Sequence, residues 1–172
     1  MLVPAGIYKE QIEKAFNAEQ YSEKLFWYDG SIDNYPHEVT TEGDKYAFAI
    51  VHSGQVIGYV SFRIDWYCSC AFNFSLIKFL DIYFENSTQE YKSSTPLMIS
   101  AIREIMRMIK SYSIHRIDFR CVSGNPAIRG YTGIIQQIEK QNYSVKISRF
   151  RDNIKDRQGK YHDTIMYEMI RE

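Results

Sequence analysis

Apolar residues recur at helical spacing near the start of the chain. Within residues 9–19, Ile12, Ala15 and Phe16 stand among charged residues. This pattern predicts a surface helix with one buried stripe. A second short helix is predicted near residues 22–27, before a stretch rich in Gly, Asp, Asn, Pro and Thr that is typical of a loop.

Three segments after this loop have the composition of strands. Residues 46–51 and 56–64 are rich in β-branched and aromatic side chains, and His52-Ser53-Gly54-Gln55 separates them. This arrangement predicts an antiparallel hairpin. The apolar and aromatic run over residues 72–85 predicts either one long strand or two shorter pieces.

A helix and a strand are predicted next. Thr95-Pro96 marks the start of the helix, because threonine can cap free amides and proline in the first turn loses no needed donor. Residues 97–109 carry a wide apolar face that should lie against a sheet. Residues 116–122 then alternate apolar and charged positions, the pattern of a strand with unlike faces.

Asn125-Pro126 repeats this cap-and-proline pattern and predicts another helix, which ends near residues 141–142. Gly130 and Gly133 weaken that helix, because each glycine costs about 1 kcal/mol relative to alanine in a helix interior. We therefore expect them to let another group approach the backbone closely.

Two further strand-like runs, residues 143–150 and 160–170, are joined through Asp156-Arg157-Gln158-Gly159 and predict a closing hairpin. The order of elements indicates an α/β fold of the mixed α+β kind. No linker, repeat or low-complexity stretch interrupts it, so residues 1–172 are expected to form a single domain.

Composition narrows the function. A chain of 172 residues with 45% hydrophobic content can bury one sizeable core. Its 21 basic and 21 acidic residues give no net charge, so neither nucleic acid nor a membrane surface is an expected partner. There is no signal-peptide pattern and no apolar run long enough to span a membrane, so we expect a cytoplasmic protein. The three cysteines should be free thiols, and the four scattered histidines suggest no metal site.

Three local patterns carry more specific information. Phe84 is followed five residues later by Gln89-Glu90-Tyr91-Lys92-Ser93-Ser94, directly before a helix rich in Leu and Met. His115-Arg116-Ile117-Asp118 precedes Gly124-Asn125-Pro126-Ala127 and Tyr131. Gly159-Lys160-Tyr161-His162-Asp163 precedes Tyr167-Glu168. In this order of elements, the three patterns resemble the phosphate-binding loop, the central segment and the closing hairpin of GNAT-superfamily N-acetyltransferases.

The resemblance covers nearly the whole chain and implies a central mixed, mostly antiparallel, twisted sheet flanked by helices. It implies transfer of an acetyl group from acetyl-CoA to a small-molecule or peptide amine, by direct attack of a primary amine in a ternary complex. The alternative is a GNAT-like module without catalysis that senses acyl-CoA or binds a protein. Members of the family place glycines where this chain has Lys92 and Ser94, and that departure motivates the alternative.

The resemblance also assigns roles to residues. A helix N-terminus offers free amides and a positive dipole end to the CoA pyrophosphate. The cofactor-contacting positions implied by the resemblance are Phe84, Gln89, Lys92, Ser93, Ser94, Thr95 and Asn125. Capping of the following helix would by itself explain Asn125.

Tyr131 corresponds to the tyrosine that faces the CoA sulfur, and a phenol is a reasonable acid for a departing thiolate. The alternative is that Tyr131 only continues the apolar stripe of its helix. Asp81 and Glu85 share one face of a predicted strand and are candidates for the general base, with a solvated surface role as the alternative.

The sequence says less about the amine that would accept the acetyl group. Asp29, Asp33, Glu38 and Glu42 make the first loop acidic, which would suit a cationic amine, although such residues are ordinary on surfaces. Tyr and Phe are dense between residues 59 and 91. A substrate groove or a homodimer interface would explain them, but strand core is the preferred interpretation.

Overall fold

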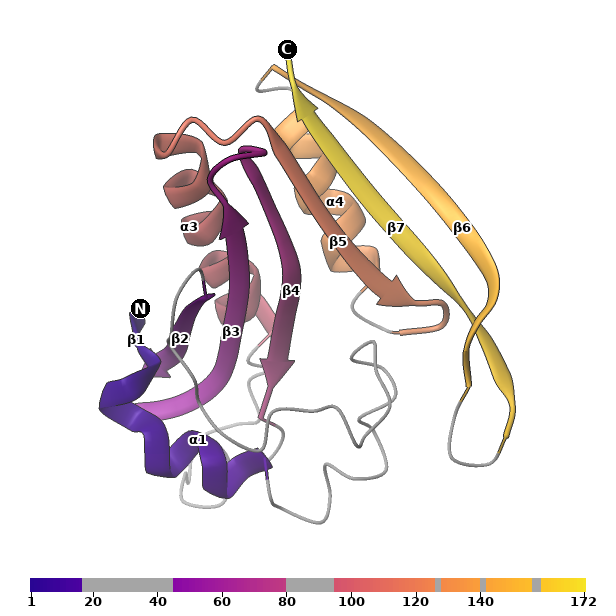
Figure 1. Ribbon diagram of the computed structural model, residues 1–172. Coiled ribbons are helices and arrows are strands. Elements are labelled where there is room, and N and C mark those ends of the chain that lie inside the picture. Colours follow the sequence, from indigo (N-terminus) through magenta and orange to yellow (C-terminus); the bar gives the residue numbers. More distant parts are fainter. Residues whose placement is uncertain (17–44, 80–94, 126–127, 140–141, 156–158) are drawn as a thin grey trace.

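The computed structural model describes residues 1–16, 45–79, 95–125, 128–139, 142–155 and 159–172 (Figure 1). Three helices, a 3₁₀ helix and seven strands lie within these residues. In chain order they are β1 (Leu2–Pro4), the 3₁₀ helix (Ala5–Tyr8), α1 (Lys9–Phe16), β2 (Lys45–His52), β3 (Gln55–Asp65), β4 (Cys70–Lys78), α3 (Thr95–Ser111), β5 (Arg116–Val122), α4 (Ile128–Glu139), β6 (Tyr143–Lys155) and β7 (Tyr161–Arg171).

The described strands form one sheet in the order β1-β2-β3-β4-β5-β7-β6. Only β4 and β5 run parallel among these neighbours, and all the other pairs are antiparallel. The chain passes through α3 between the two parallel strands, as such a crossover requires. The mixed, mostly antiparallel sheet expected from the sequence is therefore confirmed.

Helices cover both faces of the sheet (Figure 1). The larger buried cluster joins the sheet to α3 and α4, with Ile105 and Ile109 of α3 at most 1% exposed. The smaller cluster lies on the opposite face, where Ile12 of α1 packs with Tyr59 and Ile77. The apolar face predicted for α3 is thus the face that meets the sheet.

The hairpin of β2 and β3 turns through two residues, Ser53 and Gly54, both with positive φ (48° and 79°). Glycine tolerates that conformation without steric cost.

Gly58 in β3 is needed for space rather than for its backbone conformation. A Cβ there would lie 2.6 Å from the Ile77 carbonyl oxygen and 2.9 Å from the Met98 Sδ. Gly58 thus lets α3 approach the sheet closely.

A β-bulge in β4 determines the shape of the site. Ser61 of β3 pairs with Ser75 and Arg63 pairs with Phe72, so Asn73 and Phe74 both stand opposite the single residue between them. Asn73 has φ of 52°. The extra residue reverses which side chains face the helices: Ala71 does so before the bulge and Phe74 after it.

The bulge coincides with the separation of β4 from β5. Their parallel pairing covers only two residue pairs, Cys70 with Arg116 and Ala71 with Ile117. Beyond Ala71 and Ile117, the described parts of β4 and β5 are not paired across the gap. The two strands therefore diverge toward their carboxyl ends, as Figure 1 shows.

Several boundaries differ from the sequence prediction. The third strand begins at Cys70, and the part of the predicted run beyond residue 79 lies outside the described residues, as does the predicted helix near residues 22–27. β6 continues to Lys155, five residues past its predicted end, because a bulge between Phe150 and Ile154 lets pairing resume. The pattern analysis missed β1, which is only three residues long.

Candidate functional site

The divergence of β4 and β5 creates two hollows, one on each face of the sheet. Phe74 of β4 and Phe119 and Arg120 of β5 line both of them. The two hollows therefore meet at these three residues, where the strands have separated. A ligand on the side of the helices and a ligand on the opposite side would approach each other there.

The first hollow is an apolar slot of about 50 Å³ between the sheet, α3 and α4. Arg120 is the one charged residue among the described residues that line it. The slot is small because apolar side chains from both helices reach toward the gap. Its other lining residues are Val60, Phe74, Leu76, Ile102, Ile105, Met106, Phe119, Tyr131, Ile134 and Ile135.

Tyr131 projects from α4 toward this slot and meets the ring of Phe119 edge-on, with centroids 5.4 Å apart. Phe119 in turn stacks on Tyr167 of β7 at 4.6 Å and contacts Phe74 at 6.2 Å. Burial raises the pKa of Tyr167 above its ordinary value. These contacts fix the Phe119 ring and give Tyr131 a defined place beside the gap.

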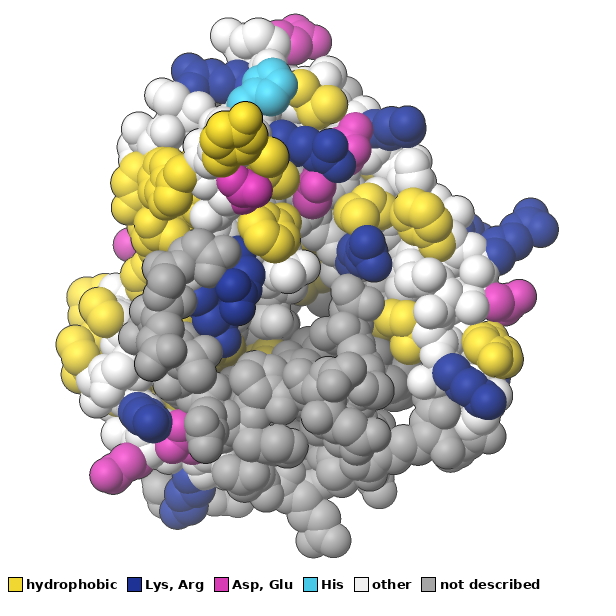
Figure 2. Space-filling model, viewed as in Figure 1, with side chains coloured by type: hydrophobic (Ala, Val, Ile, Leu, Met, Phe, Trp, Pro, Cys, Tyr) yellow, Lys and Arg dark blue, Asp and Glu magenta, His cyan; other side chains and the backbone are white. Residues whose placement is uncertain are grey.

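The second hollow is a groove of about 740 Å³ on the face of the sheet away from α3 and α4. It extends from the β3–β4 turn, at Asp65 and Cys68, to Phe119 and Arg120 at the gap. Figure 2 views the molecule from this side and shows acidic, basic and apolar side chains intermixed over the described part of the face. The groove is therefore much more polar than the slot.

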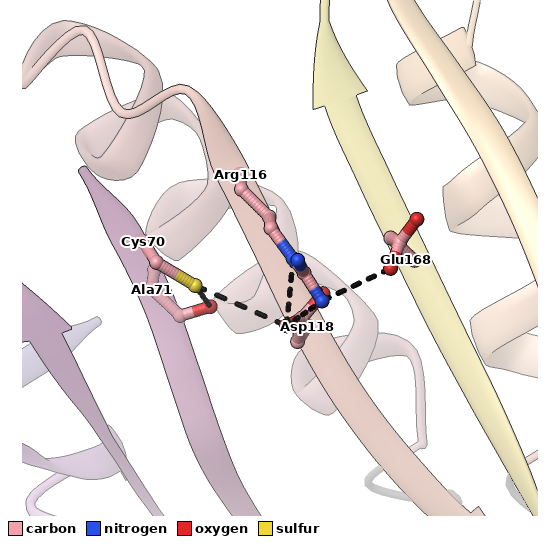
Figure 3. A network of polar contacts seen from close by, with 5 residues as sticks. All are labelled: Cys70, Ala71, Arg116, Asp118 and Glu168. Carbon is pink, nitrogen blue, oxygen red and sulfur yellow. Dashed lines mark hydrogen bonds and ion pairs between the residues drawn. The ribbon is translucent and has the colours of Figure 1, made fainter. Parts of the chain in front are cut away.

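A polar network forms part of the groove (Figure 3). The Arg116 Nε donates to both carboxylate oxygens of Asp118, at 3.0 and 2.9 Å, and its terminal nitrogen lies 3.0 Å from Glu168 on β7. Asp118 and Glu168 stand directly opposite each other in the β5–β7 pairing. Arg116 thus stabilises two neighbouring carboxylates that would otherwise repel each other.

The Cys70 thiol lies 3.9 Å from the same Asp118 carboxylate. Burial, followed by the charge of Asp118, raises the pKa of this thiol to about 11. The exposed Cys68 thiol also has a raised pKa, because it is bonded to Asp65. Since a thiolate rather than a thiol is the effective nucleophile, neither cysteine is prepared for covalent catalysis at neutral pH. None of the three cysteines, all of which are described, forms a disulfide.

The structure describes only some of the residues singled out in the sequence. The candidate bases Asp81 and Glu85 and the cofactor candidates Phe84, Gln89, Lys92, Ser93 and Ser94 lie outside the described residues, as does the acidic first loop. Thr95 is confirmed as the first residue of α3. Asn125 lies just before α4, and its carbonyl oxygen accepts a bond of 3.1 Å from the Ile128 N–H.

Gly130 and Gly133 lie on α4 beside Tyr131. A Cβ built at either position would meet no described protein atom within 4 Å. Packing of the described protein therefore does not explain the two glycines, and the close approach expected there is not made by those parts of the chain.

The sequence analysis missed the groove network and the bulge. Alternation in β5 did place Arg116, Asp118 and Arg120 on one face, but the pairing that brings Glu168 opposite Asp118 joins residues 50 apart. The bulge at Asn73 left no readable pattern, because one inserted residue does not change the composition of the strand. The described residues also contain no group of His, Cys, Asp or Glu that could hold a metal ion.

Comparisons with solved structures define the fold. A GCN5-related N-acetyltransferase from Brucella melitensis superposes with a TM-score of 0.63 at 18% identity, over 98% of this chain and 74% of that one. A probable acetyltransferase of the GNAT family from Chromobacterium violaceum ATCC 12472 gives 0.62 at 12% identity, over 99% and 85%. This protein therefore has the GNAT fold.

The microcin C7 self-immunity acetyltransferase MccE, solved in complex with acetyl-CoA and AMP, gives a TM-score of 0.61 at 13% identity, over 98% of this chain and 91% of that one. Neither a family model nor a curated protein sequence matches the chain. No helix in the described parts is long and apolar enough to cross a membrane.

Proposed function

We propose that this protein is an N-acetyltransferase that transfers an acetyl group from acetyl-CoA to a primary amine by direct attack in a ternary complex. The divergence of β4 and β5 is the observation that carries this proposal. The two hollows share Phe74, Phe119 and Arg120 where the strands separate, so the thioester can lie on the helix side and the amine can approach from the groove. Bringing two reactants together in this way supplies much of the rate of a group transfer.

Three features of the slot fit acetyl-CoA. Its apolar lining suits an acetyl group and the chain that carries it. The unpaired edges of β4 and β5 offer backbone groups to a bound ligand, since the described parts of these strands are not paired across the gap. The bare backbone at Gly130 and Gly133 leaves room beside Tyr131.

In this mechanism the neutral amine attacks the carbonyl carbon of the thioester. The nitrogen of the resulting tetrahedral adduct gives up its extra proton to solvent, the carbon–sulfur bond breaks and CoA leaves as a thiolate. Tyr131 protonates that sulfur, and its phenol is later reprotonated from solvent. The raised pKa of Cys70 supports direct attack rather than an acetylated cysteine, because its thiol stays protonated at neutral pH. We expect the reaction to take place in the cytoplasm.

The alternative is a module that binds acyl-CoA without turnover, as Lys92 and Ser94 in place of the family's glycines suggest. Release of CoA from acetyl-CoA, measured with a panel of primary amines, separates the two. We expect amine-dependent release by the wild type, and a fall of about 10²-fold or more in kcat for Tyr131→Phe. Tyr112→Phe is the matched control, because Tyr112 contacts Trp66 and Tyr46 at the far end of α3.

Binding of acetyl-CoA without release in the presence of any amine would favour the sensing module. A wild-type rate in Tyr131→Phe would contradict the acid role of Tyr131 while leaving acetyl transfer intact.

A further inference from the structure

Arg120 occupies a special place in the site. Of the three described residues that line both hollows, Phe74 and Phe119 are apolar and Arg120 carries the charge. An amine that reaches the slot from the groove by way of these residues comes close to the guanidinium. Arg120 belongs to the part of β5 that has already separated from β4, so its edge of the strand faces the gap.

The other fixed charges of the described groove are already engaged. Asp118 is bound by Arg116, which also holds Glu168. Asp65 accepts bonds of 2.9 Å from the backbone amides of Tyr67 and Cys68, which lower its pKa. The side chain of the exposed Arg120, in contrast, makes neither a hydrogen bond nor an ion pair with any described residue, although its backbone belongs to the β5–β7 ladder.

We propose, resting on the acetyltransferase function above, that Arg120 determines acceptor specificity by binding a carboxylate or phosphate group carried close to the acceptor's amine. A guanidinium pairs with both anions through two parallel N–H bonds, which fixes orientation as well as position. The rings of Phe74 and Phe119 line the same two hollows, so an anion bound at Arg120 would have apolar surface beside it. Once the anion is held at Arg120, the amine points toward the gap and the thioester.

This assignment differs from the cationic acceptor suggested by the acidic first loop. The described groove does contain carboxylates, but those of Asp65 and Asp118 already have donors of their own. An additional cation would have to compete with Arg116 for Asp118. An additional anion at Arg120 would displace no described protein group.

Matched acceptors test the proposal. The rate of CoA release is measured with alanine against alaninamide, with phosphoethanolamine against ethanolamine, and with spermidine as the cationic arm. We expect at least one anionic acceptor to exceed its neutral partner by about tenfold or more in kcat/KM, mainly through KM. Arg120→Gln should abolish that preference and Arg120→Lys should keep part of it. The control Arg103→Gln, on the exposed face of α3, should behave as the wild type.

Which pair shows the preference distinguishes a carboxylate from a phosphate acceptor. A second readout does not need turnover: N-acetylalanine should bind more tightly than N-acetylalaninamide by calorimetry, and Arg120→Gln should remove the difference. Equal use of the paired acceptors, or a preference for spermidine, would overturn this inference and leave the acetyltransferase intact. No release with any amine would instead contradict the proposed function. The calorimetric comparison would then show by itself whether Arg120 binds an anionic group.

Discussion

The ring of Tyr131 lies edge-on against the ring of Phe119, 5.4 Å between centroids, at the place where β5 has separated from β4. This contact joins the candidate acid on α4 to the strand that lines both hollows. Tyr131 continues the apolar stripe of its helix, and its ring also reaches the wall of the slot. Its position depends on the ring beneath it, which is itself stacked on Tyr167.

Phe119→Leu tests this dependence. The substitution keeps apolar volume but removes the edge-on contact, so it should cost about 1 kcal/mol of stability. If Phe119 positions Tyr131, the variant should also lose most of the kcat that Tyr131→Phe loses. The double variant should then be little slower than Tyr131→Phe alone. Fully additive losses in kcat would show that the two residues act independently.

Gly58 predicts a strict steric limit in β3. Gly58→Ala would place a Cβ 2.6 Å from the Ile77 carbonyl oxygen, and backbone cannot move aside as a flexible side chain can. We expect a loss of about 1–3 kcal/mol in the free energy of unfolding, measured by urea denaturation. Gly6→Ala is the control, because a Cβ at Gly6 meets no described atom within 4 Å. Similar stabilities for the two variants would contradict the close approach of α3 at Gly58.

The two α4 glycines predict the opposite effect on stability. Gly130→Ala and Gly133→Ala should each stabilise the protein by about 1 kcal/mol, because alanine favours the helix and meets no described atom. If the bare backbone serves acetyl-CoA, the same variants should bind it more weakly by calorimetry. Higher stability with unchanged affinity would remove these glycines from the cofactor site.

The Cys70 thiol gives a prediction that depends on pH. With its pKa at about 11, the thiolate fraction at pH 8 is roughly 100-fold below that of a thiol with the ordinary pKa of 9.0. Iodoacetamide should therefore modify Cys70 slowly in a Cys68→Ala variant at pH 8, by mass spectrometry, and faster as the pH approaches 11. Rapid modification at pH 8 would contradict the protonated thiol on which direct attack partly rests.

The same pKa shift affects stability with a definite sign. Because the pKa of Cys70 is higher in the folded state, its contribution to stability is fully present below pH 9 and is lost as the pH rises through 11. Cys70→Ser should weaken this alkaline decline. Because Cys70 titrates only at alkaline pH, it should not contribute to any change of melting temperature with pH near neutrality.

Much of this fold could be predicted from local pattern, because the predicted hairpins, α3, α4 and β5 each have a clear periodicity and recognisable residues at their ends. Thr95, for example, is expected to mark the start of a helix and is the first residue of α3. The candidate site depends on features that local pattern does not contain. The bulge at Asn73 adds one residue without a change of composition, and the meeting of Asp118 with Glu168 depends on strand order. Arg120 shares one face of β5 with Arg116, so only the three-dimensional partners distinguish them.

The described aromatic residues between positions 59 and 91 lie partly in the core and partly on the surface. Tyr59, Phe62 and Phe79 are at most 2% exposed, which confirms the strand-core interpretation for them. Trp66 and Tyr67, at the β3–β4 turn, are 55% and 99% exposed. Composition alone could not separate them, because the turn position, rather than residue type, keeps these two rings out of the core.

Calorimetric titration with acetyl-CoA, on the wild type and on Ile102→Phe, tests whether the slot beside the diverging strands binds the thioester. Ile102 is half-buried in the slot wall, so the larger ring should fill the space between the diverging strands and α3. The account predicts saturable binding by the wild type and affinity at least about tenfold weaker in Ile102→Phe, with cooperative unfolding retained in the variant. Absence of wild-type binding, or equal affinity in a folded Ile102→Phe variant, would contradict the assignment of the slot to the thioester.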